Sequence, residues 1–382
     1  MSNDLTHSRN ILLHVHIFKN AGSSFDDALS RFFGDDFVDH REDKKIVEGK
    51  QEYLEGYLRE HKNIRAFSSH SIYFNPKSTD EFTFLPVYFL RHPIDRIRSV
   101  YSFEKKQEPA TTHGSIMAKK LDFNAFIGWY MKSDSPATIR NAQTIFFAGM
   151  GPSPGRIEEK FVQAMKNLGQ APLVGLVDRY DESMVVFEEY LRRFYPDIDL
   201  SYIRRNVTDK NFHLSLEDKV DTLLSKLDDE TRKSVLENNT FDMRLYEEAK
   251  SILDRRIERI EDFENKLRDF QTRCALKLAK QLENNSKDDE VVELLLTYIE
   301  KNVKNIHLYI EFFKAKERLG DYEGAIRIAE QACEIFPNNP WVHLYLANFY
   351  RRSSEKIYEK IKKEFSSNSS LMKLIAKEDV KQ

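Results

Sequence analysis

A loop of small and polar residues near the start of the sequence has the composition of an anion-binding site. It follows the stretch from Ile11 to Ile17, whose nearly continuous apolar residues predict a buried strand of a parallel sheet. Lys19 supplies a positive charge, and a helix is predicted to follow, with Phe25 on its apolar face. The residues in between allow a tight turn: Asn20, Ala21, Gly22, Ser23 and Ser24. Free N–H groups at the start of a helix, beside a cation, suit a phosphate or a sulfate.

The order of these residues separates the loop from the common loop that binds nucleoside triphosphates. In that loop the lysine follows the last glycine and is itself followed by Ser or Thr, whereas Lys19 precedes Gly22 by three residues. An ordinary strand-to-helix turn that contains a glycine is the alternative interpretation of this segment taken alone.

A second candidate for anion binding follows another predicted strand, over residues 87–90. Arg91 comes at the end of this strand, and Ser99 lies on the helix predicted to follow it. A guanidinium fork and a hydroxyl can converge on one phosphate. Of the other two arginines on this helix, Arg98 is interpreted as an exposed cation, while Arg96 suits either anion binding or a structural pairing.

His70 is the candidate general base of the sequence. It ends a short strand predicted from residue 63, at the edge where open α/β sheets bind ligands. An imidazole suits proton abstraction near neutral pH, although a histidine here could also simply cap the loop. His16 is the second candidate base, and because it lies in the strand before the loop, we expect it to order the site.

These segments together resemble the sulfotransferases that use 3′-phosphoadenosine 5′-phosphosulfate (PAPS), in particular the carbohydrate branch with the heparan and chondroitin-type, sulfotransferase family 2-like enzymes. His16-Ile-Phe-Lys-Asn-Ala-Gly-Ser-Ser24 is similar to the 5′-phosphosulfate loop His-Ile-Pro-Lys-Thr-Ala-Gly-Thr-Ser, with Phe18 in place of the proline. Leu90-Arg-His-Pro-Ile-Asp-Arg-Ile-Arg-Ser-Val-Tyr101 is similar to the 3′-phosphate signature Leu-Arg-Asp-Pro-x-x-Arg-x-x-Ser-x-Tyr and departs from it mainly at His92. His70 stands where a catalytic base follows the strand in the resembled enzymes.

Four further segments extend the resemblance to roughly residues 10–250. They cover residues 140–149, 173–183, 204–207 and 241–246. In the first of these segments, Asn141 and Gln143 could hydrogen-bond either the cofactor or the backbone, and both interpretations stay open.

The resemblance implies PAPS as the sulfate donor, no metal, and a hydroxyl of a carbohydrate or glycolipid as the acceptor. The loop from Lys19 to Ser24 would hold the 5′-phosphosulfate, and Lys19 would also balance charge on the bridging oxygen. Arg91 and Ser99 would hold the 3′-phosphate, and His70 would deprotonate the acceptor hydroxyl for an in-line displacement. The rival functions are a nucleotide-dependent phosphotransferase on the same fold, which would need an acidic residue for magnesium, and a non-catalytic helical-repeat scaffold.

Composition narrows the setting in which the protein works. A formal charge of −3 gives no general field for polyanions, so nucleic-acid binding is not expected. No basic flank precedes an apolar run at the N-terminus, and no stretch approaches the roughly 18 apolar residues of a transmembrane segment. Cys274 and Cys333 cannot form a disulfide framework or a metal site. A cytoplasmic, bacterial-type relative of the membrane-anchored animal enzymes of the resembled family is therefore expected.

The last third of the 382 residues has a different pattern. A long amphipathic helix is predicted from residue 246 to about residue 270 and should link two domains. Beyond it the sequence repeats with a period of about 34 residues, the spacing of tetratricopeptide repeats. The best copy covers residues 306–339, and the third copy loses the pattern after Ser354 in the manner of a terminal cap. A generic helical hairpin is the alternative, and binding of a partner protein or self-association is the expected use.

The predicted fold is therefore α/β, a P-loop-like parallel sheet flanked by helices, followed by an all-α tetratricopeptide-like region. We predict a PAPS-binding sulfotransferase domain over residues 1–250, a linking helix over residues 251–271, and helical repeats with a terminal cap over residues 272–382.

Overall fold

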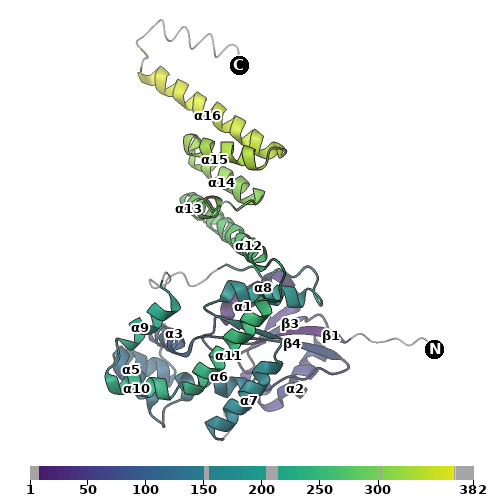
Figure 1. Cartoon of the computed structure of the whole chain (residues 1–382), viewed down its shortest axis with the longest axis vertical. Coiled ribbons are helices and arrows are strands. Elements are labelled where there is room, and N and C mark those ends of the chain that lie inside the picture. The colour runs from purple at the N-terminus through teal and green to yellow at the C-terminus, as the bar shows by residue number, and fades with distance from the viewer. Residues whose placement is uncertain (1–7, 150–154, 204–213, 302, 365, 367–382) are drawn as a thin grey trace, which may run out of the picture. The chain divides into compact units, whose positions relative to one another are not determined.

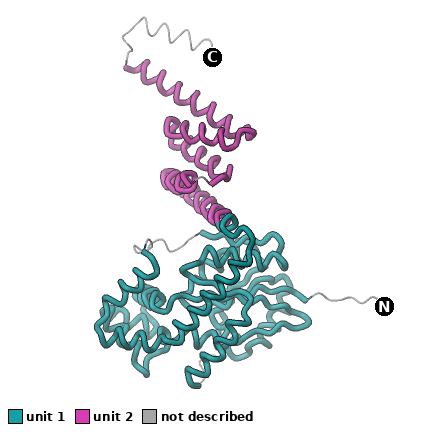
Figure 2. The backbone as a smooth tube through the Cα atoms, in the orientation of Figure 1, with its two compact units in different colours: residues 1–267 teal, residues 268–382 magenta. Residues whose placement is uncertain are grey.

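The chain forms two compact units, residues 1–267 and residues 268–382 (Figure 2). The structure is a computed structural model that describes residues 8–149, 155–203, 214–301, 303–364 and 366. Among these residues the first unit contains all the strands, and the second unit is helical.

Five parallel strands form the sheet of the first unit, in the order β2-β3-β1-β4-β5. Their bounds are Arg9–Val15 (β1), Phe37–Asp39 (β2), Ala66–Ser69 (β3), Phe82–Leu90 (β4) and Leu173–Leu176 (β5). The central strand is β1, in which Leu12 pairs with Ala66 on one side and with Leu85 on the other. Its apolar residues are buried, as expected for a strand that is covered on both faces.

The order of the strands creates a switch point at β1. The chain runs to one side of β1 for β2 and β3, and to the other side for β4 and β5. Ligands of open α/β sheets bind beyond the carboxyl ends of the strands at such a point. The segments with Lys19, His70 and Arg91 each follow the carboxyl end of a strand, so all three reach this edge.

Helices flank the sheet, which confirms the predicted α/β class (Figure 1). The helices of this unit are Gly22–Phe33 (α1), Asp43–Glu60 (α2), Pro93–Lys106 (α3), His113–Lys120 (α4), Phe123–Met131 (α5), Ala142–Phe147 (α6), Ile157–Gln170 (α7), Tyr180–Leu191 (α8), Leu216–Leu224 (α9), Asp229–Glu237 (α10) and Thr240–Ile257 (α11), with short 3₁₀ turns at Gly34–Asp36 and Ala137–Ile139.

A separate apolar cluster fixes α3, the helix that follows Arg91. Ile94 and Ile97 of α3 are buried against Phe126 and Ile127 of α5, and Val235 of α10 joins the same cluster. Because one face of α3 is packed into this cluster, the side chains on its other faces have defined positions relative to the sheet.

The helices of the second unit keep the 34-residue period of the sequence. They are α12 (Phe263–Asn284, which begins in the first unit), α13 (Asp288–Ile299), α14 (Ile306–Leu319), α15 (Tyr322–Ile335) and α16 (Pro340–Glu364). The starts of α13 and α15 differ by 34 residues, and so do those of α14 and α16.

Local backbone features of the second unit repeat at the same distance. Asn305 accepts a hydrogen bond from the N–H of His307, and Asn339 accepts one from that of Trp341. Ser286 and Gly320 both have left-handed backbone, with φ of 56° and 66°. These matching turns and helix starts show that the period belongs to the fold as well as to the sequence.

One expectation about the helices of the C-terminal third is wrong. The single helix predicted from residue 246 to residue 270 is two helices, because α11 ends at Ile257 and α12 begins at Phe263. Asp262 between them has a φ of 55°, a left-handed conformation that interrupts a right-handed helix. The third repeat copy loses the pattern after Ser354, as predicted, because α16 runs through Ser354 without the turn that ends α14 at Gly320.

None of the helices in the described part of the chain is long and apolar enough to cross a bilayer.

Candidate active site

The loop between β1 and α1 is held in an unusual backbone conformation. Lys19 and Ala21 have φ values of 65° and 59°, in the left-handed region that residues other than glycine rarely adopt. Such strain concentrates at ligand-binding sites. Ala21 takes the N-cap position of α1 and has no side chain that could accept from the first-turn N–H groups. An anion docked at this helix start would therefore meet backbone donors that no side-chain cap has occupied.

Gly22 is required by the close approach of His16. A Cβ atom added to Gly22 would lie 2.0 Å from His16 Nε2, far inside van der Waals contact. Only glycine at this position lets the imidazole rest against the start of α1. His16, the residue just after β1, thus contacts the predicted anion loop, which fits the ordering role expected of it.

A buried carboxylate holds this histidine and its neighbour. Asp26 on α1 accepts a hydrogen bond from His14 at 2.7 Å, and its other oxygen lies 3.1 Å from His16 Nδ1. Burial alone would raise the pKa of Asp26, but the two histidines outweigh it and hold that pKa well below its usual range. The three side chains could also supply ligand atoms to a metal ion, since these atoms lie within 4.8 Å of one another.

His70 is held in a tautomer that suits a base. Its Nδ1 lies 2.9 Å from the backbone carbonyl oxygen of His16. Because a carbonyl only accepts, Nδ1 carries the proton, and the lone pair of Nε2 stays available in the neutral ring. Burial, followed by the nearby charges of His16 and Arg41, lowers the pKa of His70 to about 4. The His70 and His16 rings lie 3.7 Å apart, centre to centre.

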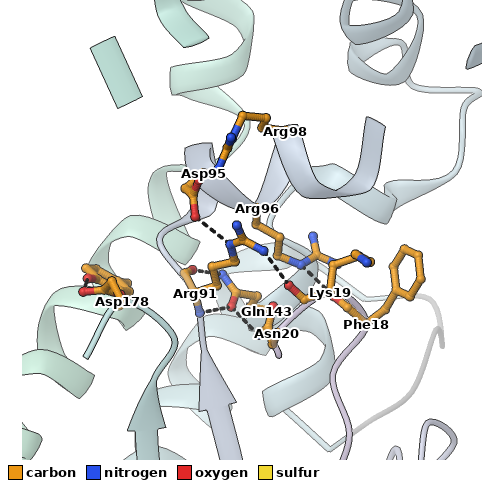
Figure 3. Close-up of polar contacts among 10 residues, drawn as sticks. Phe18, Lys19, Asn20, Arg91, Asp95, Arg96, Arg98, Gln143 and Asp178 are labelled. Carbon is orange, nitrogen blue, oxygen red and sulfur yellow. Dashed lines mark hydrogen bonds and ion pairs between the residues drawn. The ribbon is translucent and has the colours of Figure 1, made fainter. Parts of the chain in front are cut away.

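The two predicted anion-binding segments meet in one place. Arg91 donates from Nη1 to the carbonyl oxygen of Lys19 at 3.3 Å, and its Nε donates to Asp95 at 2.7 Å (Figure 3). Burial, followed by repulsion from Arg91, Lys106 and Arg96, lowers the pKa of Lys19. A cluster of positive charge therefore lies at the carboxyl ends of β1 and β4, where a polyanionic ligand would relieve the repulsion.

Gln143 clamps these segments together. Its Oε1 accepts from the N–H of Arg91 at 2.9 Å and from Asn20 at 2.7 Å, and its Nε2 donates to the Arg91 carbonyl at 2.8 Å. Asn20 also donates to the carbonyl of Phe89 at 2.7 Å. The carboxamide of Gln143 is therefore committed to the protein, and its backbone alternative is the one observed, whereas the buried Oδ1 of Asn20 has no hydrogen-bond partner among the described residues.

Asn141 likewise binds backbone. Its Oδ1 accepts from the N–H groups of Phe241 and Asp242, each at 3.0 Å, at the start of α11. Asp242 in return accepts from the N–H groups of Gln143 and Thr144 at the start of α6. Two segments that the sequence placed in the resemblance, about a hundred residues apart, thus cap each other's helices. This mutual capping of the two helices could not be predicted from the sequence, because the two segments lie far apart in it.

The remaining arginines of α3 have structural partners. Arg96 is buried and donates to the carbonyl oxygens of Phe18 at 3.0 Å and Thr138 at 2.7 Å, so the structural pairing is the observed one. Arg98 was expected to be an exposed cation, and this is wrong. Its side chain is 20% exposed and forms an ion pair with Asp95 at 3.2 Å. The acidic residue on the same helix supplies the reason, because it draws both Arg91 and Arg98 inward.

The other predicted site residues differ in their exposure. Ser23 is exposed, and Ser24 and Ser99 are half-buried. The predicted segment over residues 204–207 lies outside the described residues.

Comparisons with known proteins identify the family of the chain. A family model described as the sulfotransferase family matches residues 5–247, and the chain belongs to that family. A second model, described as the tetratricopeptide repeat, matches residues 306–349. The predicted family, at the level of sulfotransferases, and the tetratricopeptide character of the extension are thereby confirmed.

One curated relative adds to these matches. An uncharacterized protein of Archaeoglobus fulgidus is 31% identical over 251 residues, which cover 63% of this chain and 96% of that protein. No solved structure matches the chain.

Proposed function

We propose that the chain is a PAPS-dependent sulfotransferase that transfers a sulfuryl group to a hydroxyl of a carbohydrate or glycolipid. The observation that carries this proposal is the contact between Arg91 and the Lys19 carbonyl, because it joins two anion-binding segments within reach of one ligand. A donor with a phosphosulfate at one end and a phosphate at the other matches such a pair of segments.

The residues around this contact fit the two ends of that donor. The start of α1, which has no side-chain cap, offers the N–H groups of Gly22 and Ser23 and the hydroxyls of Ser23 and Ser24 to the phosphosulfate, while the N–H of Ser24 already donates to the Ala21 carbonyl. Lys19 adds a cation to balance charge that develops at the bridging oxygen when the sulfuryl group leaves. Arg91 and Ser99 take the 3′-phosphate, and Asn20 and Gln143 hold Arg91 and the loop in register.

His70 is the proposed general base. Its unprotonated Nε2 can take the proton of an acceptor hydroxyl, because Nδ1 already donates to the backbone. With a pKa near 4 the ring is neutral at physiological pH, although it is a weak base in the empty site. A bound polyanion favours the protonated ring and would therefore raise this pKa when the donor is present. His16 is assigned to ordering the loop, since its ring lies against Gly22.

The carbohydrate or glycolipid acceptor rests on the resemblance of the two anion-binding motifs. We also propose a cytoplasmic location, which rests on the composition of the sequence. For the tetratricopeptide region we propose a partner protein or self-association, which rests on the repeat pattern. The match of a repeat model to residues 306–349 supports a role in protein interaction.

A labelled-sulfate transfer assay against a panel of glycans and glycolipids tests the proposal. We expect transfer from PAPS to at least one hydroxyl-bearing acceptor without added magnesium. Calorimetry should show binding of adenosine 3′,5′-bisphosphate and indifference to ATP with magnesium. Binding of magnesium ATP in preference to the bisphosphate would instead favour a phosphotransferase, and binding of neither would favour a scaffold.

A further inference from the structure

The Lys19 side chain rests on an aromatic ring that the proposed chemistry does not use. Its ammonium lies 4.6 Å from the ring centre of Phe103, within the range of a cation–π contact. Phe103 lies near the end of α3 and is 37% exposed. The same helix that follows Arg91 therefore also supplies a resting place for Lys19.

A second aromatic residue supports this ring. Phe18 packs edge-on against Phe103, with ring centres 5.2 Å apart. The carbonyl of Phe18 is in turn held by the buried Arg96. Phe18 stands where the resembled 5′-phosphosulfate loop has a proline, so this departure from the pattern gains a physical explanation. It orients the ring that receives the neighbouring lysine.

Electrostatics explain why the ammonium takes this position. Arg91, Arg96 and Lys106 all repel Lys19, and no carboxylate of the described residues lies within ion-pair distance of its ammonium. The negative face of an aromatic ring then offers an attraction inside the site without neutralising the charge. An anionic ligand forms a stronger, charge-assisted contact, so it can draw the ammonium away from the ring.

We propose that Phe103 is a positioning residue that holds the Lys19 ammonium on its ring while the donor site is empty and releases it when the donor binds. This inference rests on the proposed function for the identity of the donor. The contact with Phe103 keeps the ammonium at the proposed donor site, whereas an unsupported ammonium repelled by three cations would turn toward solvent.

An introduced indole makes this contact visible by fluorescence. In the full-length Phe103→Trp variant, an ammonium on the ring should quench emission, and adding Lys19→Met should raise it by roughly 1.5-fold or more without ligand. Saturation of the single variant with adenosine 3′,5′-bisphosphate should raise emission to the same level. The wild-type signal, which comes from Trp129 and Trp341, is subtracted. Ser102→Trp, one residue away and exposed, is the matched control and should not respond to Lys19→Met.

The outcomes separate this inference from the proposed function. Equal emission with and without Lys19→Met in the ligand-free Phe103→Trp protein overturns the proposal, as does an equal response of the Ser102→Trp control. Emission that stays quenched at bisphosphate saturation, verified by calorimetry, overturns the release step. A wild-type protein that binds no bisphosphate would refute the donor assignment, while the ligand-free comparison would still decide the role of Phe103.

Discussion

At the scale of single residues, the pKa of His70 links the fold to the proposed chemistry. The ring is kept neutral by burial, with His16 and Arg41 adding to the effect, so its proton-accepting nitrogen is available across the neutral range. The same surroundings disfavour the imidazolium that forms after proton abstraction. The negative charge of a bound donor would offset this penalty, and catalysis would then depend on donor binding before acceptor deprotonation.

Replacement of His70 should separate binding from chemistry. We expect His70→Ala to reduce sulfate transfer by roughly 10²- to 10⁴-fold, the usual contribution of a positioned base. Affinity for adenosine 3′,5′-bisphosphate, measured by calorimetry, should be unchanged. His113→Ala is the matched control, because that histidine is exposed at the start of α4. Retention of full transfer activity by His70→Ala would remove this residue from the mechanism.

Buried neutral histidines also make stability depend on pH. Burial lowers the pKa values of His16, His70 and His92 in the folded protein, whereas in the unfolded chain these side chains titrate near pH 6.5. Between about pH 6.5 and pH 4 the unfolded chain therefore binds a proton at His70 that the folded protein does not, and the shifts of His16 and His92 act in the same direction. As the pH is lowered through this window, the free energy of unfolding should fall by at most about 1.4 kcal/mol per pH unit for each histidine, and by less where solvent screens the charge.

Urea unfolding at pH 7, 6, 5 and 4.5 measures this dependence. His70→Gln removes one of the titrating rings, so the variant should show a shallower loss of stability across the window. A wild-type stability that is flat or rises on acidification would contradict the assigned directions.

At the scale of elements, the junction of β1 and α1 depends on the absence of one side chain. Gly22→Ala would force its Cβ into the ring of His16, and such overpacking commonly costs about 1–3 kcal/mol. We expect lower stability in urea and weaker bisphosphate binding by calorimetry. Gly56→Ala is the matched control, because nothing lies within 4 Å of its added Cβ and alanine is the better helix former by up to about 1 kcal/mol. A Gly22→Ala protein as stable as the control would argue against the close approach.

The Gln143 clamp ties β4, the anion loop and α6 together. Gln143→Leu would leave the N–H and carbonyl of Arg91 without their partner, at a cost of about 1–3 kcal/mol. Because Asn20 loses the same partner, bisphosphate affinity should fall along with stability. Gln170→Leu at the exposed end of α7 should change neither quantity by a comparable amount. Unchanged bisphosphate binding in Gln143→Leu would show that the clamp serves folding alone.

The elements that could be predicted are those marked by a pattern within their own residues. The apolar run of β1 and the end of β4 at Leu90 follow from pattern alone, and both are observed, although β4 begins at Phe82 and not at residue 87 as predicted. The short β2 carries no comparable run, and its pairing is set by β3 at a distance in sequence. The partners of Asn20, Gln143 and Arg98 are long-range or depend on rotamers, so residue spacing could not assign them.

At the scale of the whole molecule, the 34-residue period was readable because each repeat contacts its neighbours in sequence. The break between α11 and α12 could not be predicted, because the apolar stripe continues across residues 258–262 although they lie outside both helices, and the left-handed backbone of Asp262 has no signal in the sequence. The structural class of a strongly periodic region can thus be predicted from its sequence, whereas a break in such a region depends on the backbone conformation of a few residues.

The two compact units suggest that donor binding does not need the repeats. A chain of residues 1–267 should bind adenosine 3′,5′-bisphosphate within about threefold of the full-length affinity, a change of under 1 kcal/mol. Calorimetry on both chains checks it. Lost affinity in a chain that still unfolds cooperatively would assign the helical unit a part in donor binding.

The hydrogen bond that fixes His70 ends on main chain, and this has an evolutionary consequence. The carbonyl of residue 16 remains whatever side chain that position carries, so genetic drift there can retune basicity without redirecting the proton-accepting nitrogen. The orientation of the His70 ring is set by the main chain, whereas its basicity is set by the surrounding side chains. Side chains around His70 can therefore change, and with them the preferred acceptor, while the hydrogen bond that orients the ring is kept.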